Sequence, residues 1–150
     1  MEESIKDGEH TLAYMKEALR LREVDPISYS PLVLAYIGDA AYELLIRTKV
    51  INHGSMQVNK MHKRSSALVK AESQAAMIKA LEEDLTPEEL AVFKRGRNAK
   101  SASSAKNATV IDYRMATGFE ALIGYLYITE QFERIVTLVS LGLDRMGELE

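Results

Sequence analysis

Apolar residues recur at helical spacing along most of this 150-residue chain. A repeat of three to four residues places apolar side chains on one face of a helix, whereas a strand requires strict alternation, which persists nowhere here. We therefore predict an all-α protein folded as a compact helical bundle. The predicted helices cover residues 9–23, 32–50, 56–70, 72–83, a segment from Thr86 to near Gly96, residues 111–128, and a last segment from Phe132 onward.

Short polar signals mark where several of these helices begin. Ser30 can cap a helix whose first residue is Pro31. Thr86 and Glu89 have the spacing of a capping box, in which each side chain bonds the other residue's backbone N–H. Residues 97–108 are small, polar and basic, which predicts a loop.

Length and composition narrow the class of protein. We place one main domain at residues 26–150, after an N-terminal extension at residues 1–25 that we expect to be helical. The chain has no cysteine, which excludes disulfides and thiolate metal sites. No apolar run approaches the roughly 20 residues that cross a membrane, so we expect a cytoplasmic protein.

Charge is distributed unevenly, although the net charge is only −3. Residues 44–71 and 90–111 contain no Asp or Glu, yet together they hold 11 of the 19 basic side chains. The local field, more than the net charge, steers a polyanion toward a protein. The two segments therefore favour a nucleic-acid partner. The alternative is that they are solvated helix faces whose counter-charges come from elsewhere in the fold.

Two carboxylates stand in helices that are otherwise apolar enough to be core. Asp39 lies in the predicted helix over residues 32–50, and Glu120 lies in the one over residues 111–128. Burying a carboxylate without a partner is costly, or shifts its pKa until the group is neutral. Each acid therefore needs a cation, a hydrogen-bond network or a wet cleft.

Glycines in the same two helices, Gly38 and Gly124, indicate how the acids can meet. Glycine weakens a helix, but it permits close approach to a neighbouring helix. Two helices pressed together, each with one inward acid, can form a site of oxygen ligands. Mg²⁺ suits such a site because it takes one or two carboxylates and keeps several waters, with Mn²⁺ as an alternative ion.

Other interpretations of these acids stay open. Asp39 and Glu120 can instead be buried partners of Arg47, of Arg114 or of a helix N-terminus. We expect Glu43, one turn after Asp39, to be solvated or salt-bridged in preference to ligating a metal. His10, His53 and His62 form no zinc-binding motif, and there is no Gly-rich phosphate loop.

Three segments together resemble the ribonuclease III family. Tyr36-Ile37-Gly38-Asp39-Ala40-Ala41-Tyr42-Glu43-Leu44 is similar to that family's signature helix, and Phe119-Glu120-Ala121-Leu122-Ile123-Gly124 to its second acidic motif. Arg64-Ser65-Ser66-Ala67-Leu68-Val69 resembles the segment between them, in the family's order. The resemblance covers about residues 30–140. It extends to the Mini-ribonuclease III branch, because the chain stops where the longer enzymes have a double-stranded-RNA-binding domain.

The resemblance implies a ribonuclease III-like catalytic domain over residues 26–150. It implies a metal-dependent endonuclease of double-stranded RNA, a homodimer joined through the signature helices, and a role in maturing the 23S ribosomal RNA precursor. Asp39 and Glu120 would be the catalytic and metal-binding residues, with Mg²⁺ as cofactor. The chain departs from the longer members at Leu32, Ala35 and Thr117, where those carry further acids. The rival interpretation is a non-catalytic helical RNA-binding or ribosome-associated module.

A catalytic dimer without a separate RNA-binding domain must hold the duplex itself. Recognition of A-form RNA is mainly of shape and phosphates. We expect phosphates to meet a basic loop that carries Lys94, Arg95, Arg97, Lys100 and Lys106, and we name as further candidates Lys60, Lys63 and Arg64.

Overall fold

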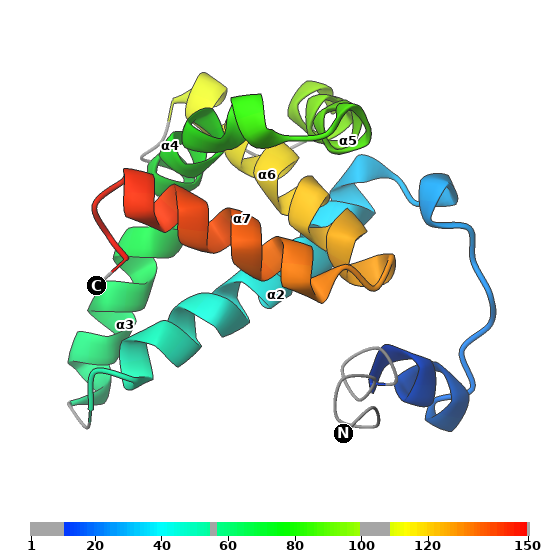
Figure 1. Cartoon of the computed structure of the whole chain (residues 1–150), viewed down its shortest axis with the longest axis horizontal. Coiled ribbons are helices and arrows are strands. Elements are labelled where there is room, and N and C mark those ends of the chain that lie inside the picture. Colours follow the sequence, from blue (N-terminus) through cyan, green and yellow to red (C-terminus); the bar gives the residue numbers. More distant parts are fainter. Residues whose placement is uncertain (1–10, 55–56, 100–108, 150) are drawn as a thin grey trace.

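The computed structural model describes residues 11–54, 57–99 and 109–149 (Figure 1). No strand occurs among these residues, and the all-α prediction is confirmed. Residues 11–18 are helical. The helices that follow are α2 (Pro31–Ile51), α3 (Val58–Val69), α4 (Ala71–Leu81), α5 (Pro87–Asn98), α6 (Val110–Ile128) and α7 (Phe132–Arg145), with 3-10 turns η1 (Pro26–Ser28) and η2 (Glu82–Asp84).

Helix α6 forms the centre of the bundle, and α2, α4, α5 and α7 pack around it (Figure 1). Every residue from Met115 to Leu126 is buried except Glu120, which is half-buried. The apolar sequence of α6 is therefore explained by neighbours on all sides. Between Met115 and Leu126, Glu120 lies at the one place where this central helix comes near solvent.

The second half of α2 and helix α3 form an arm that extends from the bundle (Figure 1). Tyr42 anchors this arm: its ring packs edge-on against Phe119 with the centroids 5.0 Å apart, and its hydroxyl donates to the Leu68 carbonyl. Ser65 is the only residue of α3 that is fully buried. Most of the α3 surface is therefore open to a partner.

The predicted helix starts are confirmed, but one predicted end is wrong. Ser30 accepts a hydrogen bond from the Val33 N–H, and the capping box of Thr86 and Glu89 has both of its bonds. Helix α5 continues past Gly96 to Asn98. Gly96 does not end the helix because it serves a helix crossing: a Cβ atom there would lie 2.8 Å from the Ala121 Cβ and 2.9 Å from the Gly118 Cα.

The predicted helix over residues 9–23 is also too long, since the chain leaves the helix after residue 18. Arg20 has a left-handed φ of 54°, and the Leu21 N–H donates to the Lys16 carbonyl at 2.8 Å. This hydrogen bond closes the helix in a Schellman motif, which satisfies one of its last carbonyls.

The helix predicted over residues 32–50 is apolar enough to be core, but one face of α2 is exposed. Leu32, Val33, Tyr36 and Leu44 are exposed, and Tyr36 retains 82% of its surface. Leu32, Tyr36 and Leu44 are separated by multiples of four residues, and Val33 stands three residues before Tyr36, so all four lie on one side of the helix. Periodicity marks apolar positions for burial but does not say whether they are buried in the chain's own core or against another chain.

Candidate active site

Helices α2 and α6 touch through their backbones. A Cβ atom on Gly38 would lie 1.8 Å from the Glu120 carbonyl oxygen, and one on Gly124 would lie 1.9 Å from the Leu34 carbonyl oxygen. Only glycine fits at either place, because backbone atoms cannot move aside as a flexible side chain can. The close approach predicted from the two glycines is therefore confirmed, and it places Asp39 and Glu120 at one crossing.

Asp39 and Glu120 lie close enough together for the Asp39 carboxylate to act on the Glu120 carboxyl group. Burial raises the pKa of Glu120 to about 8, and the hydrogen bond and negative charge of Asp39 act in the same direction. Asp39 itself is exposed, so the expectation that both acids point into the core is wrong for Asp39. The pair lies at the rim of the bundle, where one acid meets solvent and the other is half-buried.

The arginine partners considered from the sequence do not engage this pair. Arg47 bonds Glu43 at 2.9 Å, as expected for a salt-bridged Glu43. Among the described residues, no ion pair includes Asp39 or Glu120. The two acids therefore face each other without a protein cation between them.

Gln74 of α4 is the third side chain of the site, and it was not predicted from the sequence. It is 2% exposed and lies beside Glu120, where it acts to lower the pKa of that carboxyl against the larger effects of burial and Asp39. Its Nε2 nevertheless completes no hydrogen bond of normal geometry. Its spacing with Ile78 and Leu81 indicates that Gln74 is buried, but it does not indicate that Glu120 is its neighbour.

The donor set fits a hydrated magnesium ion. The described residues contain no group of three or more His, Cys, Asp or Glu that could enclose a metal. Thr117, at a position where longer family members have an acid, donates its hydroxyl to the Tyr113 carbonyl. Asp39 and Glu120 thus offer two carboxylates beside solvent, and Mg²⁺ is commonly held by one or two carboxylates with waters completing its octahedron.

Helix α5, which carries basic residues near its end, packs against the same central helix as α2. Gly96 packs against Gly118 and Ala121, the latter adjacent to Glu120, so the last turn of α5 runs beside that part of α6. Lys94 and Arg95 are exposed, whereas Arg97 lies over the Phe93 ring at 5.7 Å.

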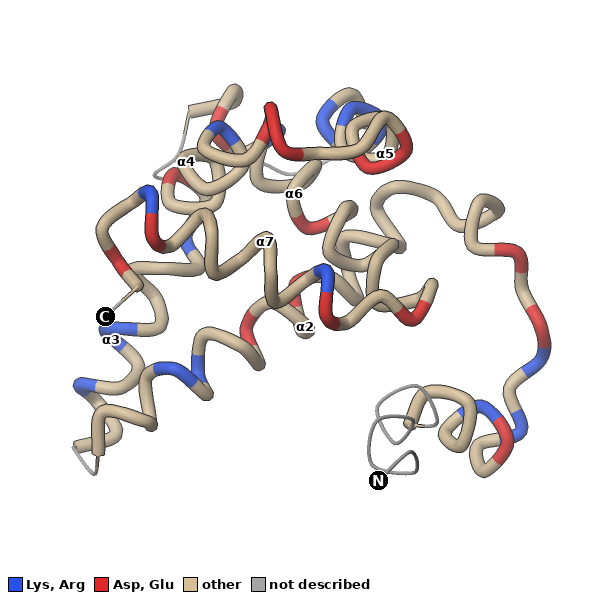
Figure 2. Tube along the Cα trace, in the orientation of Figure 1, with Lys and Arg blue, Asp and Glu red and all other residues tan. Residues whose placement is uncertain are grey.

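Several predicted RNA-binding residues are placed differently from the expected loop. Lys94, Arg95 and Arg97 all belong to helix α5, and Arg97 does so because α5 extends beyond Gly96. Lys100 and Lys106 lie outside the described residues. Basic positions also follow the arm (Figure 2), where the exposed side chains of α3 include Lys60, Lys63 and Arg64.

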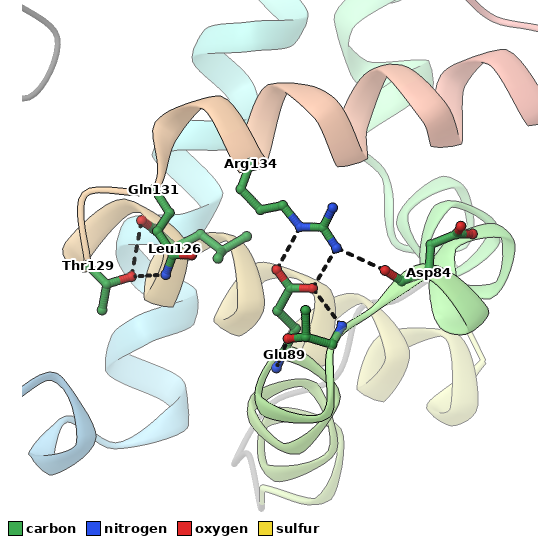
Figure 3. A network of polar contacts seen from close by, with 7 residues as sticks. Asp84, Glu89, Leu126, Thr129, Gln131 and Arg134 are labelled. Atoms are coloured by element: carbon green, nitrogen blue, oxygen red, sulfur yellow. Dashed lines mark hydrogen bonds and ion pairs between the residues drawn. The ribbon is translucent and has the colours of Figure 1, made fainter.

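A polar network fixes the other end of α5 (Figure 3). Arg134 of α7 donates two hydrogen bonds of 2.8 Å to the buried Glu89 carboxylate and one to the Asp84 carbonyl. A cleft of about 510 Å³ adjoins this network, and the Tyr125 hydroxyl at its wall donates to Glu88 at 2.5 Å. These groups bond one another, so the network aligns α5 with α6 and α7.

Within the described part of the chain, every helix is too short or too polar to cross a lipid bilayer.

Comparison with known proteins agrees with this arrangement. Residues 32–131 match the Ribonuclease III domain family. The chain is 53% identical over 120 residues to Mini-ribonuclease 3 of Clostridium tetani, covering 79% of this chain and 80% of the relative. It is 42% identical to Mini-ribonuclease 3 of a Thermoanaerobacter species, covering 91% and 96% of the two chains. A crystal structure from Fusobacterium nucleatum aligns with a TM-score of 0.75 at 31% identity, covering 81% of this chain and 99% of that one. The chain therefore belongs to the ribonuclease III family, and within it to the Mini-ribonuclease 3 group.

Proposed function

We propose that this ribonuclease is a divalent-metal-dependent endonuclease that cuts double-stranded RNA as a homodimer, with the 23S ribosomal RNA precursor as its substrate. The observation that carries the proposal is the contact of Asp39 with Glu120 at a helix crossing that only glycines permit. Two neighbouring acids with no cationic side chain between them raise each other's cost of ionisation. A divalent cation bound between the two carboxylates would attract both of them and offset their mutual repulsion.

The two acids have separate tasks in this proposal. Asp39, at the exposed rim, would hold the ion from the solvent side, and Glu120 would hold it from α6, each directly or through water. Glu120 must give up the proton that its raised pKa retains. When bound, Mg²⁺ lowers the pKa of a coordinated water and stabilises charge on the scissile phosphate. The expected products carry 5′-phosphate and 3′-hydroxyl ends, as the family resemblance implies.

The exposed stripe of α2 supports the homodimer. Leu32, Val33, Tyr36 and Leu44 are too many large apolar side chains on one helix face for ordinary solvent exposure. A two-fold interface buries the same patch of both subunits. Because Asp39 lies on α2 between Tyr36 and Leu44, this interface would bring the two active sites close together along one duplex.

The basic side chains support an RNA substrate. Lys94 and Arg95 are exposed on α5, which packs against the central helix that carries Glu120. Lys60, Lys63 and Arg64 are exposed on the arm. Phosphate contacts of this kind hold a duplex without reading its sequence. The assignment to precursor 23S ribosomal RNA rests on the family resemblance.

The rival function is RNA binding without cleavage. A binding module of this fold would also keep the basic side chains and the apolar stripe. It would have no use for an acid pair that raises the Glu120 pKa to about 8, because negative charge at the surface repels RNA. The carboxylate pair therefore favours the enzyme.

A cleavage assay tests the proposal. Purified protein is incubated with duplex RNA and with a precursor 23S fragment, in Mg²⁺ or in chelator. We expect cutting only with metal, and loss of cutting in Asp39→Asn with retained RNA binding. Thr48→Ala, an exposed change on the same helix, serves as the matched control and retains metal-dependent cutting. Binding without cutting in the wild type, or normal cutting by Asp39→Asn, would contradict the proposal.

A further inference from the structure

We propose that Gln74 is a positioning residue for the metal site: its buried amide holds the Glu120 carboxylate in the orientation that faces Asp39. This inference rests on the proposed function, since it assigns a second residue the task of preparing Glu120 for a cation. It concerns α4, a helix outside both acidic motifs.

The burial of Gln74 is the first argument. The side chain is 2% exposed, and its Nε2 has no hydrogen-bond partner among the described residues. A buried donor left unpaired costs about 1–3 kcal/mol. An apolar side chain of the same length would avoid that cost, as Met77 does elsewhere on α4. Stability of the fold alone therefore does not explain an amide at this position.

The neighbour of the amide is the second argument. Helix α4 packs against α6, and the buried Gln74 side chain lies close enough to Glu120 to act toward lowering the pKa of its carboxyl group. The Gln74 Nε2 nevertheless completes no hydrogen bond of normal geometry, so it is a buried donor still available to that carboxyl group. When one carboxylate oxygen of Glu120 faces a cation, the other oxygen can accept a hydrogen bond from the Gln74 Nε2.

The chemistry of carboxylate ligands gives the third argument. Residues that hydrogen-bond a ligating group fix its orientation, and their loss typically lowers metal affinity about 10–100-fold. Gln74 is suited to this task because an amide N–H donates without adding charge, and because its own side chain is held by the core around it. It would act through Glu120 and would not touch the ion.

The test substitution removes the amide donor of Gln74 and keeps a side chain of similar length. Gln74→Met is compared with the wild type by thermal unfolding without metal and by Mg²⁺ titration calorimetry without RNA. We expect an unfolding temperature equal to or above that of the wild type, with Mg²⁺ affinity reduced about 10–100-fold. The Mg²⁺ concentration that half-saturates cleavage should rise by the same factor, while the rate at saturating Mg²⁺ stays within about threefold. Gln74→Leu, which also lacks the donor, should behave alike.

The matched control is Met77→Leu, a buried change on the same helix whose side chain faces Gly142 of α7. It should leave Mg²⁺ affinity unchanged. Wild-type Mg²⁺ affinity in both Gln74→Met and Gln74→Leu, with or without a loss of stability, would overturn the inference while leaving the nuclease proposal intact. A wild-type protein that neither binds Mg²⁺ nor needs it for cutting would instead overturn the proposed function itself.

Discussion

Gly38 of α2 lies directly against the Glu120 backbone of α6, and a Cβ atom at Gly38 would stand 1.8 Å from the Glu120 carbonyl oxygen. Asp39 follows Gly38 in the sequence. The backbone contact that holds the two helices together therefore also places Asp39 near Glu120. The packing of the two helices and the position of the acid pair are therefore coupled at this crossing.

Gly38→Ala should separate the two helices, destabilise the fold and weaken Mg²⁺ binding. Overpacking a core typically costs about 1–3 kcal/mol, and we expect a loss at the upper end because backbone opposes the new methyl group. Mg²⁺ affinity should fall with it. Gly142→Ala is the control: its new Cβ would meet the flexible thioether of Met77, which can move aside. Urea unfolding and Mg²⁺ titration check both variants, and wild-type values for Gly38→Ala would contradict the coupling.

The raised pKa of Glu120 predicts a specific dependence of stability on pH. The folded chain keeps the proton up to about pH 8, whereas the unfolded chain releases it near the ordinary value of 4.5. The folded state then binds more protons across that window, so this group's contribution to stability falls as pH rises from 4.5 to 8. Glu120→Gln should match the wild type near pH 4.5 in chelator.

The difference in unfolding temperature between Glu120→Gln and the wild type should then increase with pH. At about pH 8.5 we expect Glu120→Gln to unfold at least about 3 °C higher, which corresponds to roughly 1 kcal/mol for a chain of this size. Saturating Mg²⁺ should close the gap, because it stabilises the ionised wild-type site alone. A gap that is constant with pH would show that Glu120 is not held protonated.

Arg134→Met should destabilise the bundle because it leaves the Glu89 carboxylate buried without its cation. Breaking a buried pair costs about 3–5 kcal/mol, and we expect about 2–4 kcal/mol here since the Arg134 side chain is 30% exposed. Burial opposes ionisation of Glu89, but hydrogen bonds from Arg134 and Thr86 outweigh it and lower the pKa. The stabilisation is therefore present above pH 4.5 and lost as pH falls below it.

The control for this change is Arg145→Met. Arg145 pairs with Asp84 at the surface, where solvent screens the charges. Urea unfolding at about pH 7 should show a clearly smaller loss for Arg145→Met than for Arg134→Met. Equal losses would mean that burial of Glu89 does not set the strength of its pair.

The carboxylate pair was predictable because Asp39 and Glu120 are charged residues in helices that are otherwise apolar. Glu120 stands alone among apolar neighbours on α6, and glycines at Gly38 and Gly124 marked where two helices touch. These are local signals, readable from composition and spacing. The same reasoning gave the capping box of Thr86 and Glu89, whose bonds join residues three apart.

Gln74 and the outward face of α2 were not predictable, because both depend on how helices assemble. Gln74 approaches Glu120 only through the packing of α4 on α6, which no spacing within α4 encodes. Tyr36 and Leu44 carry the pattern of core residues, and the pattern is the same for burial in one chain or between two. The end of α5 was misplaced for a related reason: Gly96 marks a crossing, and it resembles a terminus in the sequence.

Tyr36→Asp should convert a dimer into a monomer. The side chain is 82% exposed on the apolar stripe of α2, and a two-fold interface would bury two copies of the new charge against apolar surface. The fold should be unaffected, because Tyr36 packs against little of its own chain. Sedimentation velocity measures the change. Phe132→Asp alters an exposed aromatic residue of α7 and should leave the mass unchanged; a monomeric wild type would end the dimer proposal.

Binding of duplex RNA should weaken steeply with salt, because each neutralised phosphate releases condensed counterions. Lys94→Ala combined with Arg95→Ala should reduce the slope of log affinity against log salt by about 0.9 for each phosphate that the variant no longer neutralises, using the value for duplex DNA. Both side chains are exposed on α5, so binding should suffer while the unfolding temperature does not. Lys79→Ala removes an exposed cation of α4 and serves as the control.

Fluorescence anisotropy in chelator, from about 50 to about 300 mM salt, measures the slopes without cleavage. An unchanged slope in the double variant would assign the phosphate contacts to the α3 cations, and a wild-type affinity that does not respond to salt would contradict phosphate-led binding altogether.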